Sequence, residues 1–471
     1  MPTGMSEWLP CRFFASTLHF DRPGISSMPI RIALVLSCLV ALPTPAVIAQ
    51  SFSPAITVMF HALNRQPNDL ARYVYLTNLL PQLSASDRAI AMQMLASSED
   101  ELGLYNEAIR DFPLKSHVPA DIALPKPGEW ESAAAVDVIT KLATDRRIVM
   151  INEAHHDAHT RQLTLALLPR LRKLGFNYFA AEALLDQDPG LMQRGYPTNA
   201  SGTIYLREPT YGEIVREAIK LGFKIVPYDV AEGAAEQRDT GQAENLYQRV
   251  FAGHPDARLF VHAGYAHIDK AQGRLGTIRP MAMQLQQLTG IEPLSIDQTE
   301  FLEQIPAEPD AYQELVRNFD PKVPIVLVNR VNDKPWSADP NLYDVSVILP
   351  PSGQGAIGSG TVQPVAFVND TVRSQPMLAH YVNTQRPDWL VRQDGRFPVR
   401  ISTRLCKVVV PCVVDAHDID EPDDAIAIDR YAFMQGDTAS KLYLPPGRYR
   451  LRAWDVHGKT LSEQVIQVRQ R

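Results

Sequence analysis

The stretch that decides the fold reads Ile148-Val149-Met150-Ile151-Asn152-Glu153-Ala154-His155-His156. It starts as a run of apolar residues and ends in a carboxylate and two imidazoles. A short continuous apolar run is typical of a strand that is buried on both faces, as in a parallel sheet. Three later apolar runs also lead to a carboxylate or an imidazole: residues 178–181 precede Glu182, residues 225–228 precede Asp229, and residues 259–263 precede the turn that holds His267.

Helical patterns lie between these runs, for example at residues 162–174 and 211–221. Strands and helices therefore alternate, which predicts an α/β domain with a parallel-sheet core. Ligands of such sheets bind just beyond the carboxyl ends of the strands. We therefore expect the polar groups at the four strand ends to converge on one pocket, although they are far apart in the sequence.

These residues resemble the pattern of a known superfamily, the erythromycin-esterase, ChaN-like haem-binding and TIKI/TraB-like proteins. That pattern is a Gly-Glu-x-His or Gly-Glu-x-x-His turn after the first strand, a Glu after the second, and a Gly-x-x-His turn after a late strand. Here it falls on Glu153 with His155 or His156, on Glu182, and on Gly264 to His267, within roughly residues 142–350. His155 fits the ChaN-like and TIKI-like spacing and His156 fits the esterase spacing, so both remain candidates.

One position departs from the superfamily pattern. Asn152 stands where the family has Gly. Asn adopts a left-handed backbone more readily than most residues, so we expect the turn to form with Asn152 in that conformation.

The resemblance implies either hydrolysis of an ester or amide by activated water, or binding of haem iron. A His can act as general base while a Glu orients it, and the same groups can also ligate a divalent metal that lowers the pKa of bound water. The cofactor therefore stays open between none, a divalent metal and haem, and a scaffold of the cell envelope without catalysis is a third alternative. The candidate catalytic residues are Glu153, His155, His156, Glu182 and His267. The ligands of a metal would be Glu153, His155, Glu182 and His267. The candidate substrate-binding residues are Arg207, Tyr211, Asp229 and Tyr265.

The first part of the chain is typical of an export signal. Arg31 precedes an apolar run at residues 32–42, and small residues follow up to Ala49. This order predicts a signal peptide over residues 1–49, with Met28 as an alternative start and cleavage after Ala49. A lipoprotein anchored at Cys38 is less favoured, because few apolar residues precede that cysteine. We expect a periplasmic or secreted protein without a transmembrane segment in the mature chain.

Charge and cysteine content exclude some classes of protein. Cleavage would remove three arginines and two acidic residues, so the formal net charge changes from −7 to −8. An acidic chain is a poor binder of nucleic acid, and a small-molecule ligand or substrate is the expected partner. Only Cys406 and Cys412 would remain after cleavage. In a straight strand their Cα atoms would be about 20 Å apart, so a disulfide between them needs a turn, and their pairing stays open.

The rest of the chain suggests accessory regions around the α/β domain, which we place at residues 119–351. Residues 50–118 have an amphipathic helical pattern and are expected to form a helical cap. A Gly-rich linker at residues 352–363 precedes short β-rich runs at residues 364–471, which predict a small β-sandwich. Within it, residues 442–444 and 448–454 are expected to pair as a hairpin across Pro445-Pro446-Gly447, with Tyr449, Leu451 and Ala453 facing inward. We expect this accessory domain to fold independently.

Overall fold

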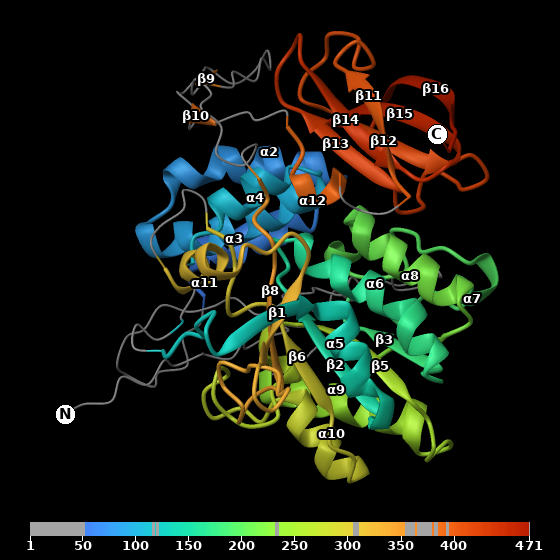
Figure 1. The fold of residues 1–471 in the computed structure, drawn as a ribbon. Helices are drawn as coiled ribbons and strands as arrows, with labels where there is room; N and C mark the ends of the chain where they lie inside the picture. Colours follow the sequence, from blue (N-terminus) through green and yellow to red (C-terminus); the bar gives the residue numbers. More distant parts are fainter. Residues whose placement is uncertain are drawn as a thin grey trace.

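The structure is a computed structural model that combines a mostly parallel eight-stranded sheet with a separate antiparallel sheet (Figure 1). It describes residues 52–470, except 115–117, 119–121, 231–234, 305–309, 354–362, 365–378, 381–384 and 392–394. The predicted signal peptide and most of the predicted linker lie outside the described residues. None of the helices in the described part of the chain is both long and apolar enough to cross a membrane.

The large sheet has the strand order β1-β7-β8-β6-β2-β5-β3-β4. Six of its strands run parallel, as the alternation of strands and helices predicts, while β7 runs antiparallel to both of its neighbours. The strands are β1 (Trp130–Ala134), β2 (Ile148–Glu153), β3 (Tyr178–Ala181), β4 (Lys224–Pro227), β5 (Leu259–Gly264), β6 (Leu294–Asp297), β7 (Ile325–Asn329) and β8 (Val345–Ile348).

Helices cover both faces of this sheet, which explains why its central strands are continuously apolar. Val149 and Ile151 pack with helices α5 (Ala135–Leu142), α6 (His159–Lys173) and α8 (Pro209–Lys220) on one face. Ile148 and Met150 pack with α9 (Ala235–Leu246) and α10 (Met281–Thr289) on the other face. Neighbouring residues of β2 thus serve opposite cores, as the two-residue period of a strand requires.

The order of the strands creates a crevice at their carboxyl ends. From β2 the chain crosses to β3 and β4 on one side, then returns to place β5 between β2 and β3. It continues with β6 on the opposite side of β2. Such a change of direction separates the connections that leave neighbouring strands, and ligands bind there in open α/β sheets.

The chain's two accessory regions pack against each other. The N-terminal helices are α1 (Pro54–Leu63), α2 (Asp69–Leu79), α3 (Ala85–Glu101) and α4 (Tyr105–Asp111). The C-terminal strands are β11 (Phe397–Ser402), β12 (Cys412–Asp418), β13 (Asp429–Phe433), β14 (Ala439–Leu444), β15 (Gly447–Asp455) and β16 (Thr460–Val468). Residues such as Met59 and Leu76 of the helices share one buried cluster with Val414 and Leu451 of the strands. Figure 1 shows the helices lying against these strands.

This shared core differs from the expected independent C-terminal domain. The connection between β12 and β13 also contacts the α/β domain, where Ile426 joins the core under α8 and Glu421 pairs with Arg216 at 2.9 Å. A region that shares apolar cores with two other parts of the chain cannot leave them without exposing apolar surface. The C-terminal region is therefore part of the structural unit.

The pairing inside the C-terminal region also differs from the expected hairpin. β15 pairs with β12 and β16 in the four-stranded sheet β13-β12-β15-β16, whereas β14 pairs with β11. The segment at Pro445-Pro446 therefore takes the chain from one sheet to the other. The predicted inward residues are confirmed, because Tyr449, Leu451 and Ala453 are all buried.

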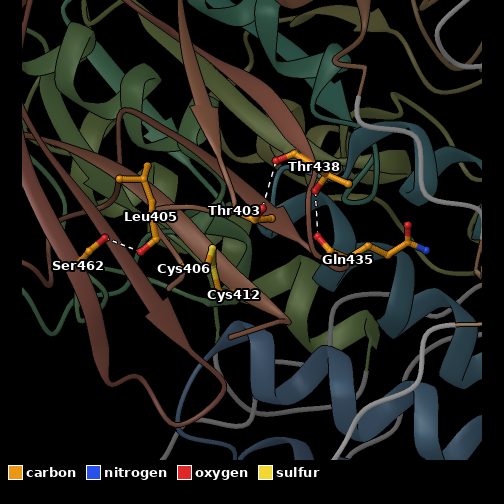
Figure 2. Close-up of a disulfide and its surroundings, with 7 residues drawn as sticks. All are labelled: Thr403, Leu405, Cys406, Cys412, Gln435, Thr438 and Ser462. Carbon is orange, nitrogen blue, oxygen red and sulfur yellow. Dashed lines mark hydrogen bonds between the residues drawn. A yellow bond between two sulfur atoms is a disulfide. The ribbon is translucent and has the colours of Figure 1, made fainter. Parts of the chain in front are cut away.

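Cys406 and Cys412 form a disulfide (Figure 2). The chain turns between them: Cys406 N donates to Thr403 O at 3.0 Å, and Val409 N donates to Cys406 O at 3.0 Å. The two Cα atoms are thereby brought to 6.0 Å, within the usual range for a disulfide. The predicted requirement for a turn is confirmed, and the bond holds this turn to the start of β12.

Candidate functional site

The turn after β2 carries the first site residues. β2 ends at Glu153, and Asp157 N then donates to the carbonyl of Ala154 at 2.9 Å before α6 begins. The helix fixes this turn as well, because Thr160 Oγ1 accepts from Ala154 N at 3.1 Å. His155 projects from the turn at the carboxyl end of a central strand, as predicted.

Glu153 and His155 form a close pair. Glu153 Oε1 lies 2.5 Å from His155 Nδ1, so the imidazole donates through Nδ1, and in the neutral ring Nε2 is then an acceptor. The ring stacks on Tyr205 with centroids 4.1 Å apart and meets the edge of Tyr265 at 5.1 Å. The orientation of His155 is therefore fixed by a carboxylate and by two aromatic rings.

Glu182 lies beside His155 across Gly264. Glu182 Oε2 accepts from Gly264 N at 2.5 Å, and Oε1 pairs with Arg238. A Cβ added at Gly264 would lie 2.6 Å from His155 Cε1 and 3.1 Å from Glu182 Oε2. A residue without a side chain is therefore required at position 264 for His155 and Glu182 to approach each other. Burial alone would raise the pKa of Glu182, but the charge of Arg238 lowers it well below its usual range.

His267 belongs to a second histidine–carboxylate pair. Its Nδ1 lies 2.8 Å from Asp239 Oδ1, which also accepts from Met281 N at 2.8 Å. Its Nε2 lies 3.2 Å from Arg238 Nη1. A guanidinium can only donate, so Nε2 accepts this hydrogen bond and Nδ1 carries the proton. Arg238 also binds both oxygens of Asp229 at 2.9 Å, so the structure places Asp229 beside the same residues.

Arg161 lies behind the Glu153–His155 pair and is fully buried. Its Nη2 lies 2.9 Å from Glu153 Oε2, while Nη1 lies 2.6 Å from Asp100 Oδ2 and 3.2 Å from Glu208 Oε2. Burial opposes the charge of Glu153, but Arg161 and His155 outweigh it and lower the pKa of this carboxyl to about 2. Glu153 is therefore a carboxylate over the whole physiological pH range.

These groups surround a small cavity of about 10 Å³, close to the space that one water molecule occupies. Five of the predicted residues line it, together with four that the sequence analysis did not single out. The predicted ones are Glu153, His155, Glu182, Tyr211 and Asp229, and the others are Ala183, Thr203, Tyr205 and Arg238. The hydroxyl of Thr203 is buried and has no hydrogen-bond partner among the described residues. The cavity thus presents a histidine, ionised carboxylates, a guanidinium and an unpaired hydroxyl.

The other predicted site residues lie at different distances from this cavity. His156 is buried beside it, stacked on Phe112 with centroids 3.4 Å apart, and its Nδ1 lies 3.3 Å from Tyr265 Oη. Burial, together with His155, lowers the pKa of His156 to about 3. His267 does not line the cavity, but it contacts two residues that do: Arg238 at 3.2 Å and Glu182 at 3.7 Å. Of the two adjacent histidines, His155 is thus the one that lines the cavity.

Arg207 does not line the cavity. Its Nη1 pairs with Asp69 of α2 at 2.8 Å, while the nearby carboxylates Glu208 and Glu213 pair with other arginines. Glu208 is turned inward because it accepts from Thr210 N and from Arg161. The predicted role of Arg207 in binding an anionic substrate is therefore not supported by its position.

The expected left-handed turn at Asn152 is wrong. Asn152 is the next-to-last residue of β2, and its side chain is buried in the sheet's end. Its Nδ2 donates to Tyr265 O at 2.8 Å and to Asp297 Oδ1 at 2.6 Å. The left-handed residue is instead Tyr265, with φ of 43°, directly after β5. Asn152 thus supports the turn that carries Tyr265 and His267.

The predicted metal ligands do not fit a divalent cation. Within the described residues, no group of three or more His, Cys, Asp or Glu side chains is placed to hold one. Glu153 and Glu182 each bind an arginine, which neutralises the charge that a cation would need. Haem fits no better, because the cavity of about 10 Å³ is far smaller than the roughly 300–1,000 Å³ of ordinary ligand pockets and is lined by charged groups.

The sequence analysis missed the two arginines that organise the site. Arg161 lies on the buried face of α6 with Thr164, Leu168 and Leu171, at the spacing of a helix. Arg238 lies on α9 four residues before Gln242 and eight before Leu246, and all three are buried. The sequence did contain a signal for both arginines, because each recurs at helical spacing with the residues of a buried helix face. A charged residue on such a face is buried and must find a partner.

No protein-family model and no curated protein matches the chain. Solved structures with a similar arrangement include the type III effector HopBA1, at 13% identity and a TM-score of 0.27, over 41% of this chain and 95% of that one. A structure described as bacterial protein toxins has 13% identity and a TM-score of 0.25, over 51% and 46%. RRSP, a MARTX toxin effector domain from Vibrio vulnificus, has 15% identity and a TM-score of 0.23, over 49% and 43%. Likenesses of this size assign neither a family nor a function.

Proposed function

We propose that this protein is an exported hydrolase in which His155 activates water for attack on an ester or amide bond. The observation that carries the proposal is the orientation of His155. Its Nδ1 is held 2.5 Å from Glu153, and the ring lines a cavity that Glu182 and Arg238 also line. A buried histidine with one nitrogen bound to a carboxylate and the other left as an acceptor is suited to general-base catalysis.

In the proposed reaction, His155 Nε2 takes a proton from water as the water oxygen bonds to the carbonyl carbon. The carbonyl oxygen becomes an oxyanion, which the positive charge of Arg238 stabilises inside a cavity of low dielectric. The bond to the alcohol or amine then breaks, and His155 returns the proton to that leaving group. Glu153 remains ionised throughout and stabilises the imidazolium, because its pKa of about 2 lies far below neutral pH.

The remaining groups of the cavity supply binding. Glu182, also ionised, accepts a hydrogen bond from the attacking water. Thr203 offers the substrate a hydroxyl, since it is buried without a partner and an unpaired buried polar group costs free energy that a ligand can recover. Tyr205 and Tyr211 form the aromatic walls. These residues favour a compact, largely neutral substrate group.

Export, the accessory regions and the superfamily are further parts of the proposal. Signal-peptide cleavage after Ala49 would place the protein in the periplasm or outside the cell, where the disulfide of Cys406 and Cys412 is stable. The N-terminal helices would act as a cap and the C-terminal strands as an accessory β-sandwich. The residues Glu153, His155, Glu182 and His267 support the resemblance to the erythromycin-esterase, ChaN-like and TIKI/TraB-like superfamily.

The test is a screen of small esters and amides with the purified mature protein and with two matched variants. His155→Asn removes the base, whereas His254→Asn changes an exposed histidine far from the proposed chemistry. Activity in wild type and His254→Asn that is absent in His155→Asn is the expected result. Hydrolysis that persists in His155→Asn would show that another group activates the water.

The alternative is a haem- or metal-binding envelope protein of the ChaN-like type. Tyr265 contacts both His155 and His156, and tyrosine and histidine are common axial ligands, but the cavity has no room for haem in this conformation. A haem titration followed by absorbance separates the two functions. A saturable Soret shift that His155→Asn abolishes, without any hydrolysis in the screen, would support the alternative. A protein that neither hydrolyses a substrate nor binds haem would leave the third alternative, a scaffold of the cell envelope without catalysis.

A further inference from the structure

Arg161 joins three segments that are distant in the sequence. Its guanidinium binds Glu153 at the end of β2, Glu208 at the start of α8, and Asp100 at the end of α3. Two of these segments belong to the α/β domain, but α3 belongs to the N-terminal helices. Asp100 lies outside the α/β domain and contacts Arg161. Arg161 in turn binds Glu153, the carboxylate that orients His155.

A second contact from Asp100 reaches the same turn. While Asp100 Oδ2 accepts from Arg161 Nη1 at 2.6 Å, its Oδ1 accepts from Ala158 N at 3.0 Å. Ala158 follows the turn that carries His155. Both oxygens of Asp100 are thus engaged by N–H donors around this turn, and one side chain fixes the arginine and the backbone together.

A third contact comes from the neighbouring helix α4. Tyr105 Oη donates to Glu208 Oε1 at 2.8 Å, while Glu208 Oε2 accepts from Arg161. The N-terminal helices therefore hold Arg161 directly through Asp100 and indirectly through Tyr105. All of these groups are buried, where hydrogen bonds between charged groups are strong and their geometry is narrow.

From these contacts we infer that the N-terminal helices form part of the active site, and that Asp100 is a positioning residue for the Glu153–His155 pair. The inference rests on the proposed function, because it gives that pair its catalytic role. Asp100 fixes Arg161 and the turn, Arg161 fixes Glu153, and Glu153 fixes the ring of His155. The α/β domain without α3 would keep the residues of the cavity but would not hold the base in place.

The next residue of α3 is a matched control. Glu101 is also buried and also binds an arginine, but its partner is Arg72. Arg72 also pairs with Asp69, which in turn pairs with Arg430 of the C-terminal sheet. Glu101 Oε1 has no hydrogen-bond partner among the described residues, so an amide fits there. An amide at position 100 must instead point an NH₂ group at Arg161 or at the backbone N–H of Ala158.

The experiment compares Asp100→Asn with Glu101→Gln in the full mature chain. Both variants remove one buried carboxylate from the same turn of α3. With Asp100→Asn, kcat falls about tenfold or more while KM stays close to wild type, because misplacing a catalytic group costs rate rather than binding. Glu101→Gln keeps the wild-type kcat. Equal effects of the two variants on kcat would overturn the inference, since the loss would then follow from stability alone.

A second readout needs no substrate. The His155 Nδ1 proton, bound to Glu153, gives a far-downfield NMR resonance that is identified by its loss in His155→Asn. This resonance shifts or disappears in Asp100→Asn and stays in Glu101→Gln. An unchanged resonance in Asp100→Asn overturns the inference. If instead the resonance responds while His155→Asn retains hydrolysis, the proposed function fails and the positioning stands.

A third variant covers the case in which Asp100→Asn does not fold. Tyr105→Phe removes only the hydroxyl that donates to Glu208 and leaves every charge in place. The expected result is a smaller fall in kcat with an unchanged KM and a shifted His155 resonance. Wild-type behaviour of Tyr105→Phe in both measurements would contradict the inference.

Discussion

The two histidine–carboxylate pairs are alike at Nδ1 of the imidazole, which contacts a carboxylate in both, but they differ in the surroundings of Nε2. Both histidines meet a carboxylate through Nδ1: His155 meets Glu153 at 2.5 Å and His267 meets Asp239 at 2.8 Å. Nε2 of His267 accepts from Arg238 at 3.2 Å, whereas the ring of His155 lines the cavity. What distinguishes a base from a supporting residue is therefore the partner of the second nitrogen.

This difference assigns a separate task to each pair. A nitrogen that already accepts from a guanidinium cannot take a proton from water without breaking that contact. His267 consequently orients Arg238, and Arg238 in turn binds Glu182 and Asp229. In the proposed mechanism, the first pair moves a proton and the second holds Arg238, the cation that stabilises the developing charge.

The largest expected effect is the loss of kcat on replacing His155, and it tests directly whether the two histidines have separate roles. His155→Asn should lower kcat by about 10²–10⁴-fold, the range for loss of a general base. His267→Asn should lower it less, by roughly 10-fold, because Arg238 keeps its two carboxylate partners. Kinetics of both variants on the same substrate provide the measurement. A greater loss in His267→Asn than in His155→Asn would reverse the two roles.

Gly264 offers a way to disturb the first pair without changing any polar group. Its backbone has φ of −76°, which alanine tolerates, but the added Cβ would lie 2.6 Å from His155 Cε1. Gly264→Ala should therefore displace the ring and lower kcat about 10–100-fold, since a shift of one ångström can cost that much. Gly253→Ala, where a Cβ meets nothing within 4 Å, is the control. Equal activities of the two variants would show that the close approach is not needed.

Removing the hydroxyl of Thr203 should have opposite effects on the stability of the fold and on the binding of substrate. Thr203→Val keeps the shape and removes the unpaired hydroxyl, so the melting temperature should not fall and should rise slightly. KM should increase about 3- to 10-fold, which corresponds to the loss of one hydrogen bond. Thr203→Ser, which keeps the hydroxyl, should retain the wild-type KM. A lower melting temperature with an unchanged KM would assign Thr203 to packing.

The smallest expected effect concerns the charge of Glu153. The pKa of Glu153 is about 2 in the folded protein, below its ordinary value of 4.5, so its ionisation stabilises the fold at pH above 4.5. This contribution is lost as the pH falls through 2. Glu153→Gln should thus lower the melting temperature most near pH 7 and least near pH 3. A destabilisation that does not depend on pH would mean that Glu153 acts through shape and not through charge.

Much of the site could be predicted from residues at strand ends. Glu153, His155 and Glu182 each follow an apolar run by at most a few positions, and parallel strands bring such positions together. The parallel sheet follows from the same runs, because strands buried on both faces must be continuously apolar. Local pattern and elementary sheet geometry were sufficient for these residues.

The remaining site residues depend on contacts between distant segments. Asp100 resembles a surface charge of an ordinary helix, since Glu99 and Glu101 flank it. Asp239 and Arg238 belong to a polar-looking helix, and Thr203 and Tyr205 come from a connection without a regular period. Their burial is decided by which segments pack on them, and this information is absent from any single window of the sequence.

The packing of α1 to α3 on the C-terminal strands has a consequence for how the chain matures. The helices emerge first during synthesis and their apolar partners emerge last, so a large part of the chain separates the two halves of one core. Closing so distant a contact makes folding slow and dependent on the complete polypeptide. A chain that lacks its last strands would leave α3 without its core, and Asp100 would not reach Arg161. Under the proposed function, the correct placement of His155 would therefore depend on the C-terminal strands as well as on the residues of the cavity.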